Sequence, residues 1–152
     1  MDTISRDNTL LTVLLVLRNL EDPSILSQRE RAELYEVGEQ LELDPDDWEF
    51  ICEGLMATIS SNLSINQLFE VTKTQLDAVN IKLLLPTEEE LAAALETGVK
   101  IERRGSSDPG EDSRPEIVKI STNFLKDSNP FTKTKQSTWL ARVVNTLNSN
   151  HN

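Results

Sequence analysis

Apolar residues recur at helical spacing along most of this chain. Between positions 48 and 59 they fall at i, i+3, i+4, i+7, i+8 and i+11, which makes one continuous stripe on a helix. Further stripes cover 65–79, 117–125 and 139–147, and a thinner one covers 34–41, where Gly38 weakens the helix. The pattern predicts a mainly α protein, an irregular helical bundle of about six to seven helices.

The segment from Thr9 to Leu20 differs from the other predicted helices. Its leucines and valines lie on most of the helix circumference rather than on one stripe. A helix that is apolar all round must be enclosed, either by its own fold or by a partner. We therefore expect this helix to anchor the core.

Capping residues mark four predicted helix starts. Ser27 with Glu30, Ser64 with Gln67 and Thr87 with Glu90 each match the capping box, in which two side chains satisfy orphan backbone amides reciprocally. Asp44 followed by Pro45 predicts a fourth start, with the aspartate as cap and the proline at the first helical position. Asn129-Pro130 is interpreted as a turn.

Two short segments predict a small non-helical element. Val99–Glu102 alternates like a strand after Gly98, which is a suitable C-cap for the helix 88–96. It pairs in this interpretation with the apolar run Ile81–Leu85. One very short two-stranded element is therefore a further expectation, and it needs packing against helices because two strands alone are marginal.

A polar segment divides the chain into two parts. Residues 105–115 contain two glycines, two prolines, three serines and no apolar side chain, which predicts a flexible loop. Residues 1–104 form the expected acidic helical bundle, and residues 116–152 a basic helical tail. The tail carries five basic and two acidic residues, a net charge of +3, which leaves −14 on residues 1–115. The apolar stripe of the tail must dock, and packing on the bundle is favoured over packing on a partner.

Composition narrows the classes of function. The net charge of −11 repels nucleic acid and anionic lipid, and aromatic residues make up only 5% of the chain. A single cysteine excludes an internal disulfide, and no leader or membrane span is recognised. We therefore expect a cytoplasmic protein that binds neither nucleic acid nor membrane.

The residue types needed for catalysis are scarce. The single histidine, His151, is one residue from the end, so the common nucleophile–histidine mechanisms and histidine metal sites are not expected. Cys52 lies on an apolar stripe and is interpreted as core. The acidic groups 44–49 and 88–90 are interpreted as capping and solvated side chains. We predict no catalytic residue, cofactor or metal.

Three short segments resemble known features. Leu85 to Val99 resembles the helix-turn-helix entry of sigma-factor-like domains, although its second helix, Val99–Arg104, is short and strand-like. The paired helices 27–41 and 46–60 resemble those of small acidic bundles such as the TerB-like domains, and the resemblance supplies no site residue. Arg103-Arg104-Gly105-Ser106 resembles a site for a basic-directed kinase, so Ser106 is a candidate phosphorylation site.

These observations favour a non-enzymatic protein–protein interaction module, such as an adaptor, regulatory subunit or assembly factor. The partner is another protein, or a second copy of this chain in a homo-oligomer. The predicted contacts lie on the last helix, where a tryptophan and an arginine accompany an apolar stripe: Trp139, Leu140, Arg142, Val143 and Leu147. Two alternatives stay open, a carboxylate-dependent metal-binding protein or hydrolase using Asp44–Glu49, and a weak DNA-binding regulator.

Overall fold

The computed structural model describes residues 3–20, 22–44, 46–95, 116–127 and 129–150, and these ranges fold as helices without strands. The predicted mainly α bundle is confirmed. The α-helices and two short 3₁₀ helices are α1 (Thr3–Asn19), η1 (Pro23–Ile25), α2 (Gln28–Leu43), α3 (Trp48–Ser60), α4 (Leu63–Asp77), η2 (Ile81–Leu84), α5 (Glu88–Leu95), α6 (Glu116–Leu125), α7 (Pro130–Gln136) and α8 (Thr138–Asn150).

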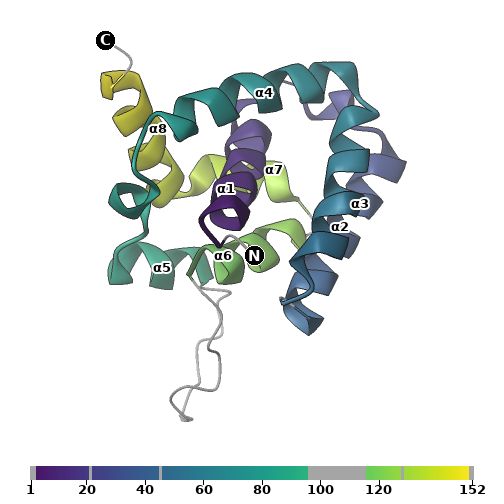
Figure 1. The fold of residues 1–152 in the computed structure, drawn as a ribbon, viewed down its shortest axis with the longest axis horizontal. Coiled ribbons are helices and arrows are strands. Elements are labelled where there is room, and N and C mark those ends of the chain that lie inside the picture. The colour runs from purple at the N-terminus through teal and green to yellow at the C-terminus, as the bar shows by residue number, and fades with distance from the viewer. Residues whose placement is uncertain (1–2, 21, 45, 96–115, 128, 151–152) are drawn as a thin grey trace.

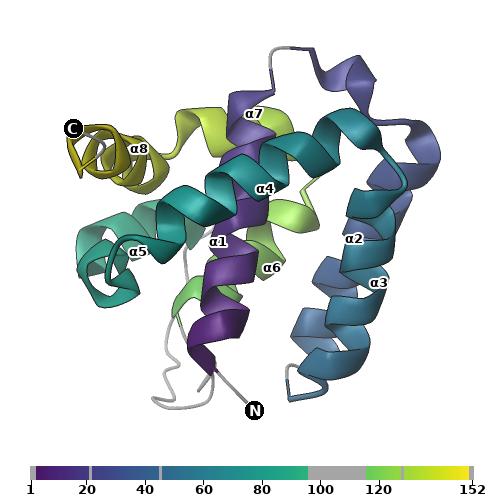
Figure 2. The same ribbon diagram turned by 45° about the horizontal axis from the view of Figure 1, so that its top comes forward.

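Helix α1 runs through the middle of the bundle (Figure 1). It contacts α4, α6, α7 and α8, and Figure 2 shows α4 crossing it on one side with α6 and α7 on the other. Every apolar residue from Leu10 to Leu17 is buried, so enclosure by neighbouring helices accounts for the apolar circumference of α1. None of the described helices combines the length and apolar content needed to cross a membrane.

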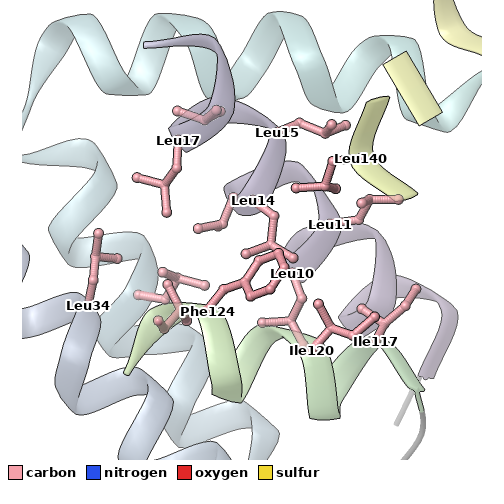
Figure 3. Packing of buried hydrophobic residues seen from close by; sticks show 14 of the residues in the cluster. Leu10, Leu11, Leu14, Leu15, Leu17, Leu34, Ile117, Ile120, Phe124 and Leu140 are labelled. Carbon is pink, nitrogen blue, oxygen red and sulfur yellow. The ribbon is translucent and has the colours of Figure 1, made fainter. Parts of the chain in front are cut away.

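The core joins α1 to the helices that follow residue 115. Figure 3 shows Leu10 and Leu14 of α1 near Ile120 and Phe124 of α6, while Leu140 of α8 lies near the other side of α1. All five side chains are at most 1% exposed. Each fully buried leucine or phenylalanine contributes about 1.5–3 kcal/mol relative to exposure, so α6 and α8 belong to the same core as α1.

Two of the four predicted helix starts are confirmed. Ser27 accepts a bond from the Glu30 amide and the Glu30 carboxylate accepts one from the Ser27 amide, and Thr87 with Glu90 repeats this arrangement before α5. The other two starts are wrong. Helix α4 begins at Leu63 with Asn62 as its N-cap, and α3 begins at Trp48 after Asp47.

The displaced start of α3 has a physical reason. Asp44 does not cap α3 because it is the C-cap residue of α2, where its amide bonds to the Gln40 carbonyl. The chain therefore turns between α2 and α3 within four residues, 44–47. This short link holds α2 and α3 together as a helical hairpin, which stands at one side of the bundle (Figures 1 and 2).

Two local expectations from sequence are corrected. Asn129-Pro130 is no simple turn: Asn129 caps α7 and Pro130 is its first residue, which adds a helix to those predicted. Ile81–Leu84 forms the 3₁₀ helix η2 and no strand, because Asn80 caps it and Ile81 and Leu84 turn into the core. Its expected partner strand, Val99–Glu102, lies outside the described residues, as does the predicted loop 105–115.

Candidate functional site

The side chains predicted to bind a partner lie inside the molecule. Trp139, Leu140 and Val143 are fully buried, and Leu147 is 6% exposed. The indole Nε1 of Trp139 donates a hydrogen bond to the Leu84 carbonyl at 2.7 Å. A partner does not reach these side chains while α8 is packed in this fold, and their role in partner binding stays a prediction.

Arg142, the polar member of that predicted set, links α8 to α5. Its Nε lies 2.7 Å from Glu90 Oε2 and its Nη2 lies 2.8 Å from Glu90 Oε1, a bidentate pair, and Nη2 also donates to the Leu85 carbonyl. The hydrogen bond from Arg142 lowers the pKa of Glu90, and the same bond raises the pKa of Arg142. Arg142 therefore has a structural partner within the chain.

Other cations of residues 116–152 also contact the acidic part of the chain. Lys135 Nζ donates to the carbonyls of Arg18 and Leu20 at the end of α1, at 2.6 and 2.9 Å. Arg18 in turn donates to the carbonyls of Thr134 and Lys135 at the end of α7. The C-terminal end of α1 thus receives Lys135 and that of α7 receives Arg18. Each cation bonds to terminal carbonyls and interacts favourably with the helix dipole. Lys126 pairs with Glu42 of α2.

The acidic cluster Asp44–Glu49 forms no convergent site. Asp44 ends α2 and Asp47 precedes α3, so these side chains flank a turn. Within the part of the chain that the structure describes, no three His, Cys, Asp or Glu side chains gather so as to hold a metal ion. Cys52 is half-buried, and desolvation raises the pKa of its thiol, which disfavours the thiolate needed for nucleophilic chemistry.

Two further candidates fall on residues outside the described ranges. Ser106, the candidate phosphorylation site, is one of them. The proposed second helix of the helix-turn-helix, Val99–Arg104, is the other; the described part of that motif is α5, which ends at Leu95.

A concave surface lies along the α2–α3 hairpin. A groove of about 610 Å³ runs between the outer faces of the two helices. The residues that line it come from successive turns of both helices: Arg29, Glu33, Glu36, Val37 and Gln40 of α2, and Phe50, Glu53, Gly54, Ala57, Thr58 and the adjoining Ser61 of α3. Sequence reasoning missed this groove because the sequence does not show which faces of α2 and α3 lie side by side.

The groove is acidic: three glutamates, Glu33, Glu36 and Glu53, and one arginine, Arg29, are its charged lining residues. From Ser27 to Ser61 the chain has ten acidic residues and two arginines, a net charge of −8 out of −11 for the whole chain. Glu33 accepts a hydrogen bond of 2.8 Å from Thr58 Oγ1 and pairs with Arg29, whose side chain is 86% exposed. Glu36 and Glu53 make no ion pair within the described residues. The groove therefore offers unpaired negative charge to solvent.

Apolar groups lie between these acids. The phenyl ring of Phe50 is 58% exposed, although a side chain of this size is usually buried. Gly54 and Ala57 follow it by one and two turns on the same face of α3, and the buried side chain of Val37 lies opposite on α2. An apolar strip with an acidic margin is typical of a protein-binding surface.

A second groove, of about 690 Å³, lies on the other side of α2, against the turn between α6 and α7. Arg31 covers the ring of Phe131 there, with 5.1 Å from the guanidinium carbon to the ring centroid. Both signs of charge line this groove, since Lys135 and Arg31 accompany Glu39 and Asp127. Of its two aromatic side chains, Phe131 is buried and Tyr35 is 42% exposed, so this groove also offers apolar surface to a partner, and it differs from the α2–α3 groove mainly in its mixed charge.

No protein-family model, curated protein or solved structure matches this chain, so the resemblance of the hairpin to TerB-like domains gains no support from a family match.

Proposed function

We propose that this protein is a non-enzymatic interaction module that binds another protein through the α2–α3 groove. Adaptor, regulatory subunit and assembly factor are the roles that such a module serves. The observation that carries the proposal is the exposed ring of Phe50 in an acidic groove along the outer face of the hairpin. Exposed aromatic side chains in concave surfaces are common anchors of protein interfaces.

Three features support a binding role over catalysis. The thiol of Cys52 is disfavoured as a nucleophile, the carboxylates of Asp44–Glu49 flank a turn, and the carboxylates of Glu90 and Glu33 are bound by Arg142 and Thr58. A protein partner also uses the whole length of a shallow groove, which a small substrate does not. The cytoplasm is the compartment we propose, in keeping with a single unpaired cysteine.

A second copy of this chain is a poor occupant of the same groove. Two hairpins that each carry −8 repel one another when they meet face to face. We therefore propose a different protein as the partner, with self-association through this face disfavoured at physiological ionic strength.

Comparative affinity capture tests this proposal. Wild-type protein, Phe50→Asp and the control Val71→Asp are immobilised and exposed to the same native lysate. Val71 is 60% exposed on α4, outside the groove, so it matches Phe50 in exposure and apolar character. We expect a partner that is retained by wild type and by Val71→Asp and lost with Phe50→Asp. Equal recovery on all three proteins would contradict the groove as the binding site.

A further inference from the structure

Two glycines lie within the hairpin helices, and only one of them has a packing reason. A Cβ atom on Gly38 would meet Lys126 Cγ at 2.8 Å and Leu125 Cβ at 3.1 Å, so a side chain there would crowd these residues where α2 approaches α6. A Cβ atom on Gly54 would meet nothing within 4 Å. Glycine in a helix interior lowers stability relative to alanine, and nothing in the described fold requires it at position 54.

Gly54 lies in the middle of the groove. Along α3, Phe50, Gly54, Ala57 and Ser61 follow one another at helical spacing on the face that lines it. A glycine without a neighbour allows another backbone to approach closely at that point. The groove extends over about 11 residues of α3, or roughly 16 Å at 1.5 Å per residue, which matches three turns of a helix.

The charged residues that line the groove favour an occupant of positive charge, because three are glutamates and the one arginine, Arg29, is paired with Glu33. Glu36 stands on the α2 wall and Glu53 on the α3 wall, and neither is ion-paired within the described residues. An occupant that lies between them meets a carboxylate on each side of the apolar strip. Lysine or arginine on both flanks of its own apolar stripe would pair with these acids and steer association.

From these observations we infer that the α2–α3 groove binds a basic amphipathic helix of the partner protein. This inference rests on the proposed function and specifies the partner's chemistry. The apolar face of the helix packs on Phe50 and Ala57 and approaches the backbone at Gly54, and its basic residues pair with Glu36 and Glu53. The complex is a third helix laid along a two-helix groove, the helix-in-groove mode of recognition.

A designed peptide of known chemistry tests this inference on the full chain. The probe is a fluorescein-labelled helix of about 14 residues, with leucines at i, i+3, i+4 and i+7 and lysines on its other faces. Control peptides replace the lysines by glutamates, or keep the composition and scramble the leucine spacing. Fluorescence anisotropy gives each dissociation constant at low and at physiological salt.

We expect the basic amphipathic peptide to bind more tightly than either control peptide. Gly54→Leu, whose side chain fills the groove, should weaken binding at least about tenfold, as should Phe50→Ala. Glu36→Gln with Glu53→Gln should weaken binding and reduce its salt dependence. Val71→Ala should leave the dissociation constant of the peptide unchanged. Circular dichroism melting of each variant establishes that it is folded, which Gly54→Leu should be because position 54 faces open space.

Two results would overturn the inference. Equal binding of the scrambled peptide means that charge alone attracts the probe, and unchanged binding by Gly54→Leu places the helix elsewhere. Its failure is separable from failure of the proposed function. Suppose that Phe50→Asp loses a partner in the capture experiment while the peptide shows no preference for the basic helix. The interaction module then stands, and only the basic helix as occupant is rejected.

Discussion

At the scale of single residues, the contrast between Gly38 and Gly54 carries most information, and sequence could not supply it. Both glycines interrupt helical patterns in the same way, and the pattern marks Gly38 only as a weak point in its helix. The difference lies in the neighbours, since Leu125 and Lys126 of α6 crowd Gly38 whereas Gly54 faces open space. A sequence does not record which helix lies opposite a given position.

This contrast gives the first prediction. Gly54→Ala should raise the free energy of unfolding by about 0.5–1 kcal/mol, because alanine favours the helix and its methyl group meets no atom. Gly38→Ala should lower it by about 1 kcal/mol, because the steric conflict with Leu125 and Lys126 outweighs the same helix gain. Urea unfolding measures both variants. Changes of the same sign would show that the surroundings of the two glycines do not differ as described.

The Glu90–Arg142 pair predicts a dependence of stability on pH. The bond from Arg142 lowers the pKa of Glu90 below its ordinary value of 4.5 in the folded state. The folded state therefore gains stability from Glu90 above pH 4.5 and loses it as the pH falls through the lowered value. Because Arg142 is partly exposed, solvent screens the pair, and we expect Glu90→Gln to cost about 1 kcal/mol at pH 7.

Chemical unfolding from pH 7 to pH 3 checks that prediction. The difference between wild type and Glu90→Gln should shrink toward zero at the acid end of the series. Glu89→Gln, a change at an exposed neighbour, serves as the control and should cost less at every pH. A difference that stays constant through the acid range would mean that the ionised carboxylate is not the source of the stability.

At the scale of elements, two of the predicted caps are confirmed, and in each the two side chains that complete the cap are three residues apart. Ser27 with Glu30 and Thr87 with Glu90 match the four-residue pattern, and both caps are present. The pattern fails where two candidates compete for one end. Asn62 displaces Ser64 at α4, and Asp44 ends α2 instead of beginning α3. Helix α7 escapes prediction because seven residues are too short for a recognisable stripe.

Helix α8 shows what an apolar stripe cannot reveal. The stripe alone suits a partner-binding face, yet the surface that covers it belongs to η2, α1 and α5 of the same chain. A helix face that is buried within its own chain and one that is buried against a partner have the same apolar pattern in the sequence. Only the position of α8 in the fold separates the two interpretations.

The burial of α8 gives a prediction at this scale. Trp139→Ala should lower the free energy of unfolding by about 3–5 kcal/mol, because it removes a fully buried ring and leaves the Leu84 carbonyl without its donor. Asn145→Ala, at an exposed position on the same helix, should change stability by less than about 0.5 kcal/mol. Thermal melting of both variants provides the comparison, and a wild-type melting temperature for Trp139→Ala would show that α8 lies outside the core.

At the scale of the whole molecule, the charge asymmetry is visible in the sequence, but its arrangement is not. The basic residues after position 115 contact separate elements: Lys126 pairs with Glu42 of α2, Lys135 donates to carbonyls at the end of α1, and Arg142 pairs with Glu90 of α5. The acids of the α2–α3 hairpin are left largely without such partners. The negative charge of the chain is therefore concentrated on the α2–α3 hairpin, at one side of the bundle, and three of its glutamates line the groove that contains Phe50 and Gly54.

The most direct test of the groove as the binding site is an NMR titration of the ¹⁵N-labelled full chain with the basic amphipathic peptide. Binding in the groove predicts that the largest amide shift changes fall on Val37, Gly54 and Ala57, with Val71 of α4 unaffected. Shift changes that centre on α8, or that spread evenly over every acidic face of the molecule, would contradict the α2–α3 groove as the site where this protein binds its partner.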